Sequence, residues 1–171
     1  MIFYHSCLFH CNSGFLPFRI TDEDHPVLQV TQYGAIAYAK WKSKRLPTKS
    51  EWEKAARGGL VGKEYPWGDT ISHSNANYEG TDGSDIWLET APVGSFPPDR
   101  YGLYDMAGNA SERCSDLYDN DPDLRVIRGG AWGNERAFLR CASRYGTGLT
   151  SLDNNVGFRC AKDTDKTVIK R

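Results

Sequence analysis

Two short alternating segments in the last third of the chain constrain its fold most. Val126 and Ile127 lie between arginines and precede a double glycine at 129–130, and residues 156–161 alternate in a similar way. Such patterns predict two short strands. The residues between them, 133–155, are mostly small, hydroxylic or aromatic. Because recognition loops have this composition, we expect an adaptable segment held between rigid ends.

Two helices are predicted before residue 60. Thr31 can cap the first helix, which is expected to run through Ser43. Thr48 and Glu51 form a capping box for the second, which ends at the double glycine 58–59. The side chains expected to form the apolar faces of these helices are Ala35, Ile36, Tyr38, Ala39, Trp41, Trp52, Ala55 and Ala56.

The middle of the chain is predicted to be mostly loop. Residues 58–98 are rich in Gly, Pro, Asn, Asp and Ser, which indicates long irregular connections. A loop of that length in a compact domain is generally functional or tied down. Residues 101–109 then predict a short strand and a tight turn. Short strands beside two helices favour an α+β fold over a wound parallel sheet.

Composition excludes several classes of partner. The chain has 171 residues, 39% of them hydrophobic, which fits one compact domain. Its 21 basic and 22 acidic residues supply no electrostatic footprint for nucleic acid or an acidic membrane. Arg136, Arg140 and Arg144 recur every four residues and are interpreted as members of scattered ion pairs. No membrane insertion is expected, and residues 1–18 lack the pattern of a secretion signal.

Five cysteines are present, and two of them lie near the start. His5, Cys7, His10 and Cys11 have the side chains of a zinc site, but their spacing matches no closed site, so thiols near a terminus are the preferred interpretation. The remaining cysteines, Cys114, Cys141 and Cys160, are predicted to be reduced.

Six motifs occur in an order that resembles one family. They are RLPTKSEWEKAARGG at 45–59, YPWGD at 65–69, PVGSFP at 92–97, GLYDMAGN at 102–109, RGG at 128–130 and GFR at 157–159. Together they resemble the formylglycine-generating enzyme (sulfatase-modifying factor) superfamily over about residues 25–162. The resemblance implies a C-type lectin-like α+β fold for residues 25–171, with two helices, short mostly antiparallel strands and long loops. Residues 1–24 form a divergent N-terminal segment.

The resemblance implies a member without catalysis. Enzymes of this family that oxidise a sulfatase cysteine use two reactive cysteines after the RGG motif, where copper binds. Those positions fall at about Asn134 and Leu139, and neither side chain can supply a thiolate. We therefore expect no catalytic residues and no catalytic cofactor.

Other positions also depart from the family pattern. Cys141 and Cys160 match structural half-cystines, but their usual partners fall at Ala39 and Ala56, so these disulfides cannot form. Relatives commonly carry tryptophans at the positions of Ser111, Arg113 and Leu117. The packing around these three positions is therefore expected to differ.

Structural calcium is a further expectation. Asn77, Glu79, Asp82 and Asp85 offer oxygen ligands, although their spacing alone favours solvated acidic turns. Family members often bind structural calcium, and the resemblance implies the side chains of Asn77 and Asp85 with the carbonyl oxygens of Tyr78 and Trp87 as ligands. The tripeptides of calcium-dependent sugar binding are absent.

Residues 133–155 look like the variable region of proteins diversified by retroelements. Altering the adenines of an AAC codon gives NNC codons, which cannot encode Trp, Met, Gln, Lys or Glu. Only Glu135 belongs to that set in this segment. The alternative is that a loop rich in Gly, Ser and Thr lacks those residues anyway.

The sequence therefore predicts a non-catalytic ligand-binding protein, receptor or adhesin-like, with exchangeable side chains on a rigid scaffold. Phe138 and Tyr145 are expected to anchor the ligand. We expect the ligand to be an unidentified protein or surface. The sequence does not specify the location, and display on a virion or cell surface is one expectation. The alternatives are a formylglycine-generating oxidase or divergent maturation factor, and a structural or viral tip component whose loop is fixed. The predicted ligand surface is Gly133, Asn134, Glu135, Ala137, Phe138, Ser143, Tyr145, Gly146, Thr147, Gly148, Leu149, Ser151 and Asp153, and the predicted buried supports are Trp132, Leu139, Val156 and Phe158.

Overall fold

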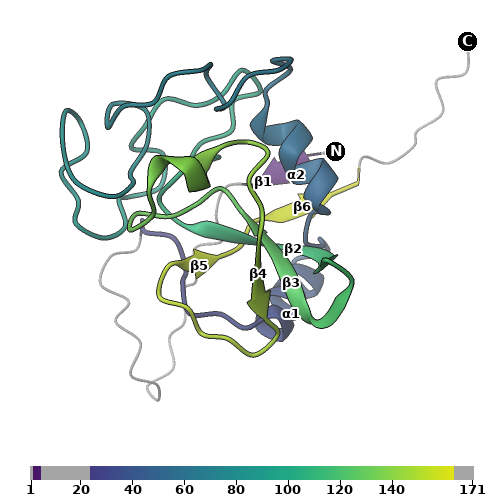
Figure 1. The fold of residues 1–171 in the computed structure, drawn as a ribbon. Helices are drawn as coiled ribbons and strands as arrows, with labels where there is room; N and C mark the ends of the chain where they lie inside the picture. The colour runs from purple at the N-terminus through teal and green to yellow at the C-terminus, as the bar shows by residue number, and fades with distance from the viewer. Residues whose placement is uncertain (1, 5–23, 164–171) are drawn as a thin grey trace, which may run out of the picture.

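The computed structural model describes residues 2–4 and 24–163, which form an α+β domain (Figure 1). Two helices are present in this part of the chain, α1 (Gln32–Trp41) and α2 (Lys49–Ala56), with a short 3-10 helix η1 (Arg136–Leu139). The strands are β1 (Ile2–Tyr4), β2 (Ser111–Tyr118), β3 (Asp121–Arg128), β4 (Tyr145–Gly148), β5 (Val156–Gly157) and β6 (Cys160–Lys162).

The strands form two sheets. The larger has the order β4-β3-β2-β5, and β1 pairs with β6 in the smaller one. Only the pairing of β2 with β5 is parallel, and the other pairs are antiparallel. The predicted strand at residues 125–128 is confirmed within β3, whereas residues 156–161 form two separate strands, β5 and β6, in different sheets. The expectation of two helices with short, mostly antiparallel strands is confirmed. The Cys/His cluster at residues 5–11 lies outside the described residues.

Both predicted helix caps are present. The Oγ1 atom of Thr31 accepts the Gly34 amide at 3.0 Å. In the capping box, Thr48 Oγ1 accepts the Glu51 amide at 3.2 Å, and the Glu51 carboxylate accepts the Thr48 amide at 2.9 Å. Helix α1 ends at Trp41, two residues earlier than predicted, because Ser43 adopts a φ of 55° that an α-helix cannot continue.

Trp41 corrects the predicted apolar face of α1. Its side chain is 72% exposed, whereas Ala35 and Ala39 on the same helix are buried. The Lys42 ammonium lies 4.1 Å from the Trp41 ring, which gives the exposed indole a cation–π contact in place of a core position.

The core consists of three apolar clusters. The first packs α2 against the sheet through Trp52, Ala55, Ala56, Met106, Cys114, Val126 and Cys141. The second joins Ala35, Ala39, Leu46, Phe158 and Cys160, and the third joins Tyr65, Ala76, Ala107 and Leu139.

The cysteines in these clusters follow the family pattern without its cross-links. Cys141 shares a cluster with Ala56, and Cys160 shares another with Ala39. Cys114 and Cys141 are buried free thiols, which confirms the prediction of reduced cysteines for these two. Burial raises the pKa of Cys141 to about 11. This thiol is therefore protonated at neutral pH.

Residues 57–110 are all described and contain no named helix or strand. They form the blue to teal loops at the upper left of Figure 1. The predicted strand in 101–109 is wrong, because Asp105 and Asn109 have φ values of 54° and 63°, which interrupt an extended chain. The expectation that the loop is tied down is confirmed at Asn109, whose side chain bonds the Ala91 amide at 2.9 Å and the Ala91 carbonyl at 3.1 Å.

No described helix is long and apolar enough to cross a bilayer.

Candidate functional site

A buried ion pair joins β2 to the chain between β5 and β6. Arg159 Nη2 donates to Glu112 Oε1 at 2.7 Å, and Trp52 Nε1 donates to Glu112 Oε2 at 2.6 Å. Arg159 and Glu112 are 1% and 4% exposed. Because breaking such a pair leaves a buried charge without compensation, this contact holds α2, β2 and the chain before β6 in one arrangement.

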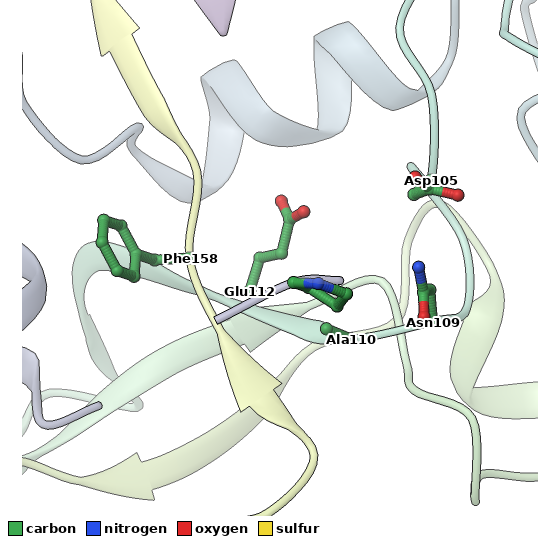
Figure 2. Close-up of a pocket in the computed structure, with 6 residues that line it drawn as sticks. Asp105, Asn109, Ala110, Glu112 and Phe158 are labelled. Carbon is green, nitrogen blue, oxygen red and sulfur yellow. The ribbon is translucent and has the colours of Figure 1, made fainter. Parts of the chain in front are cut away.

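A small cavity adjoins this ion pair. Figure 2 shows Asp105, Asn109, Ala110, Glu112 and Phe158 around it. Its volume is about 10 Å³, enough for about one water molecule. This cavity is too small for an organic ligand.

A second, open cleft has a volume of about 440 Å³. It is lined by Tyr78 and Glu79 from the long loop and by Glu135 and Arg136 at the start of η1. The Glu79 amide donates to the Asn134 carbonyl at 3.1 Å, so the two walls are joined by the main chain. The volume falls within the range of small-molecule sites, although the lining is polar.

Tyr78, the aromatic residue of the cleft, is held in place by contacts with His73. The Tyr78 ring stacks on the His73 ring with centroids 3.9 Å apart and planes 4° from parallel. His73 in turn contacts the Asp85 carboxylate at 3.0 Å. Burial raises the pKa of the Tyr78 hydroxyl, and the charge of Arg136 acts in the opposite direction. The phenol is therefore neutral and can donate a hydrogen bond.

The predicted ligand surface is brought together only in part. Phe138 and Tyr145 stack with ring centroids 4.6 Å apart, so the two predicted anchors are neighbours. Glu135 faces the cleft. Of the predicted residues, Gly133, Glu135 and Gly146 are exposed, and Asn134, Ala137, Phe138, Ser143, Tyr145, Gly148, Leu149, Ser151 and Asp153 are half-buried.

Strand β4 corrects this prediction. Thr147 is only 7% exposed, and its hydroxyl donates to the Asp153 carboxylate at 2.6 Å. A Cβ atom at Gly146 would lie 2.7 Å from Tyr118 Cδ1, so this glycine is exposed yet admits no side chain. Thr147 and Gly146 are therefore parts of the scaffold. The sequence did not reveal this, because a four-residue strand inside a Gly- and Thr-rich segment has the composition of a loop.

The predicted buried supports are mostly confirmed. Leu139, Val156 and Phe158 are each at most 3% exposed. Trp132 is half-buried instead, and its Nε1 atom is enclosed without a hydrogen-bond partner. Sequence reasoning missed the exposed Thr150, Leu152 and Asn154 and the cleft residue Arg136, since their contacts depend on how the segment folds back.

Asn134 and Leu139 stand at the positions expected for the family's reactive cysteines, and both side chains make structural contacts. Asn134 Oδ1 accepts the Ala131 amide at 2.9 Å. Leu139 is fully buried beneath Gly130, where a Cβ atom would come within 2.7 Å of Leu139 Cδ1. Neither position supplies a thiolate, and the buried thiol of Cys141 is protonated at neutral pH.

The residues expected to bind calcium, Asn77 and Asp85, both lie in the long loop. Asp85 and Asn77 are 1% and 0% exposed, and Asn77 Oδ1 is enclosed without a hydrogen-bond partner. The Asp85 carboxylate accepts the amides of Tyr78 at 3.4 Å and Trp87 at 3.3 Å. A buried oxygen without a partner and a buried carboxylate are groups that suit a hard cation. Among residues 2–4 and 24–163, however, no three His, Cys, Asp or Glu side chains cluster around one point.

The arginines at four-residue spacing confirm the ion-pair interpretation in two cases. Arg140 Nε lies 3.5 Å from Glu64, and Arg144 Nη2 lies 2.8 Å from Asp119. Arg136 lines the cleft instead.

Comparison with known proteins identifies relatives of two kinds. Serine/threonine-protein kinase Pkn1 of Chlamydia trachomatis is 44% identical over 156 residues, covering 81% of this chain and 24% of that protein. Inactive C-alpha-formylglycine-generating enzyme 2 of Bos taurus is 41% identical, covering 81% and 50%. Formylglycine-generating enzyme of Streptomyces coelicolor is 39% identical, covering 84% and 54%. The chain thus spans between about a quarter and about half of these relatives.

Solved structures agree on the fold. PvdO from Pseudomonas aeruginosa is 29% identical and superposes with a TM-score of 0.71, covering 80% of this chain and 61% of that one. Treponema denticola variable protein 1 is 24% identical with a TM-score of 0.70, covering 90% and 76%. The sulfatase-modifying factor enzyme 1-like domain matches residues 13–164. With most of its length matched in this way, the chain belongs to the sulfatase-modifying factor enzyme 1-like domain family.

Proposed function

We propose that this chain is a non-catalytic ligand-binding domain that presents exchangeable side chains on a C-type lectin-like scaffold. One observation carries the proposal. A cleft of about 440 Å³ opens beside the positions of the family's reactive cysteines, and those positions hold an amide and a buried leucine. The site therefore offers a binding surface without the thiolates that copper and oxygen chemistry need.

The distribution of exposure supports a display role for part of residues 133–155. Glu135 borders the cleft, and Thr150, Leu152 and Asn154 are exposed on a loop between β4 and β5. Gly146 and Thr147 belong to the scaffold, which narrows the proposed exchangeable set. The fold shared with Treponema denticola variable protein 1 is consistent with diversification by a retroelement. Display on a virion or cell surface is the setting in which such a surface meets its ligand.

The runner-up is a formylglycine-generating oxidase or a divergent maturation factor. Its support is the 39% identity to the formylglycine-generating enzyme of Streptomyces coelicolor. The 41% identity to an inactive relative of Bos taurus is similar, so identity alone does not separate the two functions.

Structural calcium belongs to the proposal as a means of fixing the long loop. Asn77 Oδ1 and the Asp85 carboxylate would hold the ion through their oxygens. The ion would supply charge that keeps the Tyr78 wall of the cleft in place, and no chemical step is assigned to it.

Sequencing the DNA downstream of the gene tests the proposal. We expect a near-identical template copy whose differences from the codons of residues 133–155 fall only at adenines, with a reverse transcriptase gene nearby. A matched assay incubates the copper-treated protein with a sulfatase peptide and follows conversion of the peptide cysteine to formylglycine by mass spectrometry. Absence of a template together with peptide conversion would overturn the proposal in favour of the oxidase.

A further inference from the structure

Arg113 is a buried cation whose hydrogen bonds go to main-chain oxygens. Its side chain is fully buried in β2. Nε donates to the Val30 carbonyl at 2.9 Å, Nη1 to Gly148 at 3.3 Å and Nη2 to Ser151 at 2.8 Å. Burying a charge is costly unless its donors are satisfied, so these bonds must form for the charge to be tolerated.

The three carbonyls join two distant parts of the chain. Val30 precedes helix α1, whereas Gly148 ends β4 and Ser151 lies in the connection from β4 to β5, the yellow-green loop that passes α1 in Figure 1. Burial lowers the pKa of Arg113 and the nearby Asp153 carboxylate raises it. Because an arginine side chain stays protonated in proteins, the guanidinium of Arg113 keeps its charge and all of its N–H donors.

Besides the side-chain bond from Thr147 to Asp153, three further contacts dock this loop through its main chain. The Leu149 amide donates to the Asp123 carbonyl at 3.2 Å, and the Leu149 carbonyl accepts the Gln32 amide at 3.0 Å. The Asp153 carbonyl accepts the Gln29 amide at 3.2 Å. None of these bonds depends on the identity of the side chains at positions 149–152.

We propose that Arg113 fixes the conformation of residues 148–153 through the carbonyls of Gly148 and Ser151, so that this loop keeps one shape whatever side chains positions 149–152 carry. A carbonyl is present at every residue, and a guanidinium has five donors in a fixed fork. Arg113 is thus a positioning residue for the proposed display surface. The inference deepens the proposed function. The display role of the loop rests on the proposed function, whereas the anchoring by Arg113 does not.

Hydrogen exchange on the whole chain tests this inference without a ligand. The amides to follow are those of Gln29, Gln32 and Leu149, and the Trp52 amide, which donates to Thr48 in α2, is the internal control. In Arg113→Met, we expect the amides of Gln29, Gln32 and Leu149 to exchange at least about tenfold faster while the Trp52 amide is unchanged. In the matched variant Leu149→Ser/Leu152→Ser, we expect the same amides to stay within about threefold of the parent protein.

Two results would overturn the inference. One is unchanged exchange of the three amides in Arg113→Met. The other is faster exchange in the double serine variant that equals the effect of Arg113→Met, since side chains would then hold the loop. If Arg113→Met does not fold, Arg113→Lys replaces it, because a single ammonium cannot span three carbonyls. Faster loop exchange in Arg113→Lys supports the inference, and exchange equal to the parent protein refutes it.

The two proposals fail separately. If exchange shows that Arg113 holds the loop but no template copy lies downstream, the anchoring proposal stands and the diversification proposal fails. If a template copy is found but the Arg113 variants exchange like the parent protein, the diversification proposal stands and the anchoring proposal fails.

Discussion

The backbone amide of Glu79 donates to the carbonyl oxygen of Asn134 at 3.1 Å and thereby joins the long central loop to the segment that follows the RGG motif. Glu79 and its neighbour Tyr78 form one wall of the cleft, and Glu135 and Arg136 form the other. The shape of the cleft therefore depends on how firmly the long loop is held.

Breaking the buried ion pair of Glu112 and Arg159 is expected to be strongly destabilising. Arg159→Met leaves the Glu112 carboxylate buried without its cation, and the free energy of unfolding should fall by about 3–5 kcal/mol. Denaturant unfolding measures this change. As a control, Lys63→Met removes an exposed partner of Asp69 and should change the same quantity by less than about 1 kcal/mol. Equal effects of the two variants would contradict the assignment.

Gly146 and Gly133 provide a matched pair within the segment 133–155. In Gly146→Ala the new Cβ atom meets the Tyr118 ring 2.7 Å away, so we expect a loss of about 1–3 kcal/mol in the free energy of unfolding. Gly133 has no atom within 4 Å of the corresponding position, and Gly133→Ala should stay within about 0.5 kcal/mol of the parent protein. Thermal unfolding compares them, and a tolerated alanine at 146 would restore that residue to the exchangeable surface.

Calcium removal should lower the melting temperature if the ion binds at Asn77 and Asp85. Asp85→Asn removes the charge but keeps the shape, so chelation should shift its melting temperature far less than that of the parent protein. Glu89→Gln, an exposed carboxylate on the same loop, is the control and should respond to chelation as the parent does. A parent protein whose melting temperature is the same with and without chelator would argue against the site.

Stability should fall with acid through Glu51. Its hydrogen bond to Arg45 at 2.6 Å lowers the pKa of the Glu51 carboxyl from 4.5 to about 2. Because the folded-state pKa lies below the unfolded one, the contribution is complete above pH 4.5 and is lost as the pH falls toward about 2. Denaturant unfolding of Glu51→Gln across this window should show a shallower loss than the parent protein. Parallel curves would mean that Glu51 does not contribute this dependence.

Local signals predicted the elements that local contacts stabilise. The capping box at Thr48 and Glu51 concerns residues three apart, and the structure confirms it. The alternation at Val126 and Ile127 likewise predicted a strand. The same reasoning failed at residues 101–109, because Asp105 and Asn109 adopt left-handed conformations and the Asn109 side chain bonds the distant Ala91. Nothing in the local sequence indicates that partner.

The sequence by itself determined the family, the two helices, the segment with the composition of a display loop and the lack of cysteines at Asn134 and Leu139. Only the tertiary structure decided that Tyr78 and Arg136 share a cleft, that Thr147 is buried and that Arg113 holds the loop by its carbonyls. The physical reason is that periodicity and capping report contacts between near neighbours in sequence. Burial and hydrogen bonding across the fold depend on which distant backbone atoms come within reach.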